Sequence, residues 1–169
     1  MLILFLLLLE CSVKLFSCED SYVCRQCGNI VLTIPSIFNK PSIIAKEILN
    51  EKVLGPNQTT KNILVQKFIN PENIPLYLIS TKTANVFEFG KKIVKDSFYK
   101  DFTHVPVFCK KCRKHLGWLY EPRQSACLKS DPEEMCHELY DKNAFYGILR
   151  SEICSRNYAD SLIIYRQHL

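Results

Sequence analysis

The sequence predicts an all-β fold, and three observations lead to that prediction. Short apolar runs are separated by Pro, Gly and Asn, which is the pattern of antiparallel strands joined by turns. No segment has the convincing apolar spacing of a long amphipathic helix. Two Cys-x2-Cys pairs stand far apart in the chain, as expected where one metal ion joins two hairpins. With 169 residues, the chain is long enough for one domain with its own core.

The expected strands follow one another along the chain. In order they are NIVLTIPSIF cut by Pro35, a strand and loop within PSIIAKEILN, NILVQKFI, PLYLIST, NVFEFG, HVPVFC, HLGWLYEP and AFYGILRSEI. Turn-forming residues end them, since NILVQKFI stops at Asn70-Pro71 and NVFEFG stops at Gly90. HVPVFC and HLGWLYEP flank the second cysteine pair as the arms of a hairpin, and DSLIIYRQHL closes the chain.

The N-terminus is expected to be a secretory signal peptide, residues 1–17, cut near Cys18. Leu2 to Leu9 are unbroken apolar residues, far fewer than the roughly 20 needed to span a bilayer. Such a run at the extreme N-terminus is typical of a signal peptide, and the alternative is a buried N-terminal strand. The mature domain would then be residues 18–169, secreted and not inserted in a membrane.

Four cysteines are arranged for a metal ion. Cys24 and Cys27 form one Cys-x2-Cys pair, and Cys109 and Cys112 form another, with 81 residues between the two pairs. Two such turns supply a tetrahedral set of four thiolates, which zinc fills without an open position. The sequence therefore predicts one structural zinc per chain. His115 follows closely, but four thiolates already saturate the ion, so we expect it to pack or hydrogen-bond beside the site.

The remaining cysteines of the mature chain are disulfide candidates in a secreted protein: Cys18, Cys127, Cys136 and Cys154. Cys127 and Cys136 flank the polar segment LKSDPEEM and can bridge it, which leaves Cys18 with Cys154. The other two connectivities stay open. Asn57 begins an Asn-Gln-Thr sequon and is an expected glycosylation site if the chain is secreted.

The charge does not favour a nucleic-acid partner. The net charge is +5 with scattered positives, and the tight cluster Lys110, Lys111, Arg113 and Lys114 surrounds the second cysteine pair. A basic patch beside a metal site can contact nucleic acid or a phosphate. We favour the alternative of a solvated loop, and expect no nucleic-acid partner and a monomer.

Several motifs together resemble a known family. CKKCRKHLGWLY holds a Cys-x2-Cys followed by His-x-Gly-Trp, and FINP precedes it as a turn. Further residues match in FYGILRSEI: Phe145, Gly147, Leu149, Arg150 and Ser151. Over roughly residues 21–153 the chain resembles the CULT domain, the thalidomide-binding domain of cereblon. The resemblance implies a β-tent of two antiparallel sheets meeting near a right angle and joined by the zinc, here as a secreted, single-domain member.

The resemblance also implies a cage for a small cyclic ligand, imide- or pyrimidine-like. The three tryptophans of the family fall on Phe98, His104 and Trp118, with Tyr120 at the base. The residues carried over to this site are Asn70, Pro71, Asp96, Ser97, Phe98, His104, Trp118 and Tyr120. Taken alone, Phe98 reads as a core residue and His104 as a surface histidine, so their place in a site is implied by the resemblance.

Two other functions compete with ligand binding. The scaffold is similar to that of methionine sulfoxide reductases of the B type, which need an Arg-x-Cys-x-Asn motif. Cys154 lacks an Arg two positions before it, and Asn157 stands one position too far, so we expect no enzyme activity. The second alternative is a module that binds an extracellular peptide with the same surface.

Overall fold

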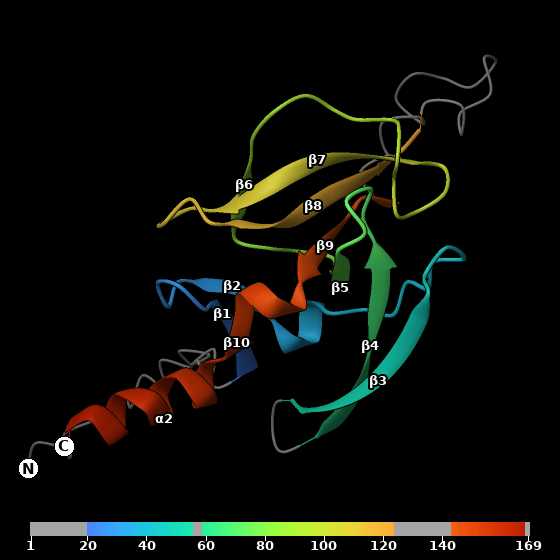
Figure 1. Ribbon diagram of the computed structural model, residues 1–169. Coiled ribbons are helices and arrows are strands. Elements are labelled where there is room, and N and C mark those ends of the chain that lie inside the picture. The colour runs from blue at the N-terminus through green and yellow to red at the C-terminus, as the bar shows by residue number, and fades with distance from the viewer. Residues whose placement is uncertain (1–19, 56–58, 124–142, 168–169) are drawn as a thin grey trace, which may run out of the picture.

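The computed structural model describes residues 20–55, 59–123 and 143–167, and these form two antiparallel sheets (Figure 1). The small sheet has the order β10-β1-β2, and its strands are β1 (Ser21–Cys24), β2 (Ile30–Thr33) and β10 (Ile153–Ser155). The large sheet has the order β3-β4-β5-β9-β8-β7-β6. Its strands are β3 (Glu47–Leu54), β4 (Thr60–Ile69), β5 (Pro75–Thr81), β6 (Val86–Glu88), β7 (Phe102–Cys109), β8 (His115–Pro122) and β9 (Phe145–Leu149). The predicted fold class is confirmed.

Several boundaries lie where the sequence places them. β2 ends before the short 3-10 helix η2 (Ile34–Ser36), because the ring of Pro35 fixes φ and favours the first turn of a helix. β4 ends at Ile69, directly before Asn70-Pro71. β7 and β8 form the expected hairpin around the second cysteine pair. The predicted signal peptide and the residues Cys18, Asn57, Cys127 and Cys136 lie outside the described residues.

The sequence does not predict the helix that the structure has at the C-terminal end of the described residues. A helix, α2 (Arg156–Gln167), follows β10 and a short 3-10 helix, η5 (Arg150–Glu152). The Ser155 hydroxyl accepts a hydrogen bond from the backbone N–H of Tyr158 at 3.3 Å, as an N-terminal cap does. Arg156 and Asp160 form an ion pair at 2.9 Å, one turn apart. These polar contacts stabilise a segment whose apolar spacing is weak. None of the helices in the described part of the chain is long and apolar enough to cross a membrane.

Strand β7 shows how the large sheet presents two different faces. Thr103, Val105 and Val107 are buried, whereas His104 and Phe108, which alternate with them, stay partly exposed. Side chains of a strand point to opposite faces in turn, so the buried residues share one face of β7 and the partly exposed residues share the other. His104 therefore lies on the same face as its β8 partner Tyr120, which belongs to the aromatic part of the core.

The core has two parts. An aliphatic cluster contains residues of both sheets, including Leu32 of β2, Ile79 of β5 and Leu116 of β8. An aromatic cluster is built around Tyr99, Tyr120 and Phe145. The rings of Tyr120 and Phe145 are stacked with centroids 5.2 Å apart, and the Tyr99 ring lies edge-on to both at 4.8 Å. Tyr120 is fully buried in this cluster, and partly buried residues such as Phe98 and Trp118 pack against the cluster.

Strands β8 and β9 approach each other closely at Gly117. This residue has φ of 144°, and a Cβ atom there would lie 2.0 Å from the carbonyl oxygen of Gly147. A side chain at this position would collide with the neighbouring backbone, and the φ value is one that residues other than glycine rarely adopt. Gly117 immediately precedes Trp118, so this close approach fixes the backbone from which the tryptophan side chain projects.

Strand β3 forms one edge of the large sheet. All eight of its residues pair with β4, and none of them is buried. Ile48 and Leu49, which point to opposite faces, are both exposed. In Figure 1, β3 and the paired part of β4 extend away from the rest of the sheet.

Candidate functional site

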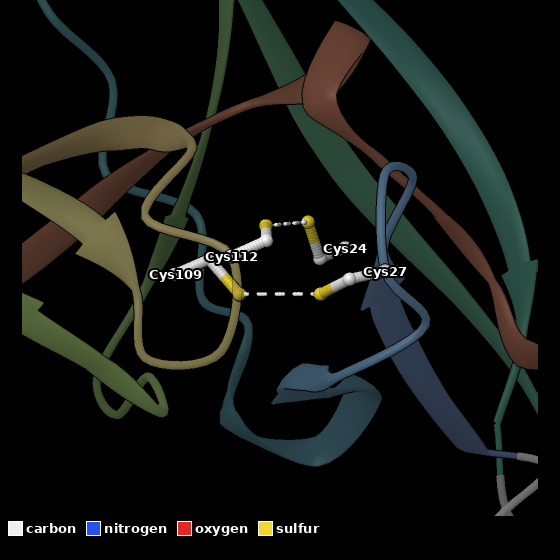
Figure 2. Close-up of side chains that lie close together, drawn as sticks. All are labelled: Cys24, Cys27, Cys109 and Cys112. Carbon is white, nitrogen blue, oxygen red and sulfur yellow. Dashed lines mark hydrogen bonds between the residues drawn. The ribbon is translucent and has the colours of Figure 1, made fainter.

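The four predicted metal ligands meet at one place. Cys24 and Cys27 lie at the turn between β1 and β2, and Cys109 and Cys112 lie at the turn between β7 and β8. All four sulfur atoms are within 4.8 Å of one another. Figure 2 shows the two pairs facing each other across the gap between the turns, with Sγ atoms 3.6 Å apart for Cys24 and Cys112 and for Cys27 and Cys109. The cluster can hold a metal ion and thereby join the two sheets.

The two turns have the same backbone design. In each, the first cysteine donates its N–H to the residue five positions on and accepts a hydrogen bond from the residue four positions on. The donor and acceptor pairs are Cys24 N to Asn29 O at 2.8 Å, Gly28 N to Cys24 O at 2.9 Å, Cys109 N to Lys114 O at 2.8 Å and Arg113 N to Cys109 O at 3.0 Å. Both thiols of a turn are held toward the same point as a result.

The residue after the second cysteine is left-handed in both turns, with φ of 71° at Gly28 and 64° at Arg113. Glycine adopts this conformation readily, whereas a side chain makes it costly. The guanidinium of Arg113 lies 4.4 Å from the ring centroid of Phe87. This cation–π contact offsets part of the conformational cost.

The thiols of the cluster differ in their tendency to ionise. Burial raises the pKa of Cys24 to about 12 and also raises the pKa of Cys27. Burial disfavours the Cys109 thiolate too, but the backbone N–H groups of Cys112 and Lys111 donate to it and lower its pKa to about 7. A full set of thiolates therefore needs a cation among them, which is what a metal ion supplies.

The fifth described cysteine stands apart from this cluster. Cys154 is buried on β10, opposite Val23 of β1, and forms no disulfide with another cysteine of the described residues. Its predicted disulfide partner Cys18 lies outside the described residues, so the pairing stays a prediction.

A cavity of about 280 Å³ lies on the face of the large sheet that carries His104, Trp118 and Tyr120. It is lined by residues of the turn after β4, the start of β5, the connection before β7, and strands β7 and β8. These residues are Asn70, Pro71, Glu72, Leu76, Ile93, Lys95, Asp96, Phe98, His104, Trp118 and Tyr120. Seven of the eight residues predicted for the ligand site are among them, and Ser97 is the exception.

The walls of the cavity are aromatic. The rings of Phe98 and Trp118 are perpendicular with centroids 5.7 Å apart, and the His104 ring lies edge-on to Trp118 at 6.5 Å. Phe98 is stacked on Phe68 at 4.7 Å, which supports it from behind. Tyr120 lies beneath His104, with ring centroids 6.1 Å apart, and is fully buried. Flat faces on several sides suit a small planar ring.

The rim of the cavity is formed by two tight turns. Asn70 accepts a hydrogen bond from the N–H of Ile74 through its side chain at 2.7 Å and closes the turn after β4. Asp96 has a left-handed φ of 56° and lies directly before Ser97, whose hydroxyl donates to the carbonyl of Tyr99 at 2.9 Å. Asn and Asp tolerate such turn conformations better than most residues.

His104 brings a titratable group into the cavity wall. Its backbone N–H and carbonyl both bond to Ile93, at 2.9 and 2.8 Å. Its Nδ1 atom is buried and has no hydrogen-bond partner among the described residues. Burial lowers the pKa of His104, and the nearby Asp96 carboxylate acts in the opposite direction. The imidazole therefore favours its neutral form.

His115 lies between the cysteine cluster and the cavity. Its ring is 4.8 Å from that of Trp118 and 5.3 Å from that of Phe108. Burial lowers its pKa. It packs against aromatic rings beside the cluster, as expected, while the cysteines supply the cluster itself.

Four lining residues were not anticipated: Glu72, Leu76, Ile93 and Lys95. Glu72 follows Asn70-Pro71, and Lys95 precedes Asp96, so extending the two rim segments by one residue finds both. Ile93 reaches the cavity because it bridges His104, a pairing with no signature in the sequence.

A scan against models of protein families finds no match to this chain, and a search of curated proteins finds none either.

Proposed function

We propose that this protein is a secreted, zinc-containing binding protein, without enzyme activity, that holds a small imide- or pyrimidine-like ring in its aromatic cage. The observation that carries the proposal is that Phe98, His104, Trp118 and Tyr120 line one cavity. The resemblance of the cysteine and His-x-Gly-Trp motifs to the CULT domain supports the same reading.

Zinc is the metal that best fits the cysteine cluster. A tetrahedral zinc with four thiolates at about 2.3 Å places its sulfur atoms about 3.8 Å apart. The two facing pairs lie at 3.6 Å, close to that spacing. Four thiolates leave no open coordination position, so the ion stabilises the fold and does not take part in catalysis. Metal analysis of the purified protein tests this, with one zinc per chain expected.

The polar groups at the cavity give the ligand its expected character. Trp118 offers the largest flat face, and stacking on such a ring contributes about 0.5–1.5 kcal/mol beyond area burial. Asp96 and Glu72 add negative charge to the lining, and Lys95 adds positive charge. These charges leave one net negative charge in the lining, which suits a neutral or weakly cationic ring.

Ligand titration tests the proposal directly. A glutarimide, a uracil-like ring and a small ammonium compound are titrated while the fluorescence of Trp118, the single tryptophan, is followed. Trp118→Ala is expected to abolish binding measured by calorimetry. Phe89→Ala is the matched control, because Phe89 is 70% exposed and does not line the cavity. If no probe binds the wild type, a domain that binds an extracellular peptide becomes the better reading.

The pH dependence of binding separates ligand classes. The unperturbed pKa of histidine is about 6.5, and burial lowers that of His104. Protonated His104 repels a cation, so an ammonium probe is expected to bind more weakly as the pH falls below this range. A neutral imide is expected to change less. His104→Phe should remove the difference between the two probes.

Secretion and its consequences are tested on material from the culture medium. We expect the mature chain to begin near Cys18, to carry a glycan at Asn57 and to contain two disulfides. Retention of Met1 in an intracellular product would refute all three. Thiol counting adds a test of the enzyme alternative, because a reactive Cys154 would support a reductase.

A further inference from the structure

We propose that Ser42, Gln66 and Tyr99 are positioning residues that fix the Phe98 wall of the cavity. This inference rests on the proposed ligand site and explains how one of its walls is held. Phe98 belongs to the connection between β6 and β7, which carries several exposed residues, including Lys95 and Asp96. Something other than regular strand pairing must therefore hold the ring in place.

The three residues and Phe98 form a closed cycle of hydrogen bonds. The Ser42 hydroxyl donates to the carbonyl of Phe98 at 2.6 Å. The backbone N–H of Ser42 donates to Oε1 of Gln66 at 2.7 Å. Nε2 of Gln66 donates to the hydroxyl of Tyr99 at 2.9 Å, and Tyr99 is covalently joined to Phe98. The wall is thus tied to strand β4 from both its own carbonyl and the next side chain.

The cycle is buried and its polar groups are used. Gln66 is 0% exposed, and its amide also donates to the carbonyl of Lys40 at 2.9 Å. The Tyr99 hydroxyl also forms a hydrogen bond with the hydroxyl of Ser80, at 3.0 Å. A buried polar network with all of its members satisfied specifies one arrangement, because any shift leaves a polar group unpaired. A glutamine in the centre of a core strand is unusual enough to need such a role.

The position of Phe98 decides the shape of the cage. Its ring lies between Phe68, on which it stacks at 4.7 Å, and Trp118, which it meets edge-on at 5.7 Å. Stacking alone leaves the ring free to slide over Phe68, and the cycle removes that freedom at the backbone. A binding site gains affinity when its walls are held before the ligand arrives.

Ser42→Ala tests the inference, with Ser36→Ala as the matched control. The Ser42 hydroxyl donates to Phe98 and accepts from the N–H of Ile44, and the Ser36 hydroxyl bonds to Thr33 and Thr81. Both variants lose a hydroxyl with two hydrogen-bond partners, but the partners of the Ser36 hydroxyl do not belong to the cycle. We expect Ser42→Ala to weaken glutarimide binding about three- to tenfold, the equivalent of one hydrogen bond, and Ser36→Ala to leave it nearly unchanged.

A second measurement needs no ligand. Hydrogen exchange of the amides of Ser97, Phe98 and Tyr99 is expected to accelerate in Ser42→Ala and not in Ser36→Ala, at equal metal content. Should Ser42→Ala fail to fold, Tyr99→Phe takes its place and is expected to give the same two changes. Equal exchange in the Ser42 and Ser36 variants overturns the inference. If the wild type binds none of the three probes, the proposed function fails while the exchange measurement still decides the positioning role.

Discussion

The β7–β8 hairpin carries two sites that are built in opposite ways. At its turn, Cys109 and Cys112 belong to a cluster whose two halves share one local hydrogen-bond pattern. Along its strands, His104 and Trp118 belong to a cavity completed by segments distant in sequence. The cluster depends on spacing within each turn, whereas the cavity depends on the packing of the whole sheet. Mutations at the two sites should therefore have different effects on the protein.

Removal of one metal ligand is expected to have the largest effect. Cys109→Ser should prevent folding or lower the free energy of unfolding by several kcal/mol, because zinc binding of about 10–16 kcal/mol in zinc-finger peptides is coupled to folding. Phe89→Ala, which alters an exposed ring outside the cluster, is the control. Thermal unfolding and metal analysis measure both. A folded, metal-free Cys109→Ser would break the contrast between the two sites.

A change between the two sites is expected to come next. Gly117→Ala places a Cβ against the carbonyl of Gly147 and should lower the free energy of unfolding by about 2–5 kcal/mol. Gly90→Ala is the control, because Gly90 also has a positive φ but its Cβ would make only an ordinary contact, 4.0 Å from the side chain of Pro106. Chemical denaturation compares them. Equal losses of unfolding free energy in the two variants would mean that the positive φ, and not the collision with Gly147, causes the loss in Gly117→Ala.

Acidification is expected to destabilise both sites, with a smaller effect. Burial lowers the folded-state pKa of His104 in the cavity and of His115 beside the cluster. The unfolded chain then binds protons more readily, so the stability contributed by neutral histidine is complete above a pH of about 6.5 and is lost as the pH falls toward the folded-state pKa. His104→Phe and His115→Phe should each flatten the fall in stability between pH 7 and 5. If the dependence of stability on pH is unchanged in one of these variants, the histidine replaced there does not cause the fall in stability.

The smallest expected effect lies inside the cluster, at the left-handed position that the two turns fill with different residues. Gly28→Ala should cost about 1 kcal/mol, because alanine is disfavoured in the left-handed region. Arg113→Gly should change stability by less than about 0.5 kcal/mol, since relief of the backbone is offset by loss of the contact with Phe87. Denaturation of the zinc-loaded variants measures both. A large loss in Arg113→Gly would show that the two turns are less alike than their backbones.

The same contrast explains what could be predicted from sequence. The cysteine ligands and the strands ended by Pro35 and by Asn70-Pro71 follow from short-range chemistry, and they agree with the structure. Helix α2 was missed because its support is a serine cap and an ion pair and not a clear apolar stripe. The role of Gln66 could not be foreseen, because its partners lie 24 to 33 residues away in the chain.

Strand β3 has a consequence for the motions of the protein. It is bound to the sheet by its ladder with β4, by the ion pair of Glu51 with Arg150 at 3.1 Å and by the partial packing of Val53. None of its side chains is buried, so few apolar contacts oppose its detachment. Segments of this kind open at a lower free energy than the core. The amides of β3 should therefore exchange by local opening, while those of β8 and β9 exchange when the whole domain unfolds.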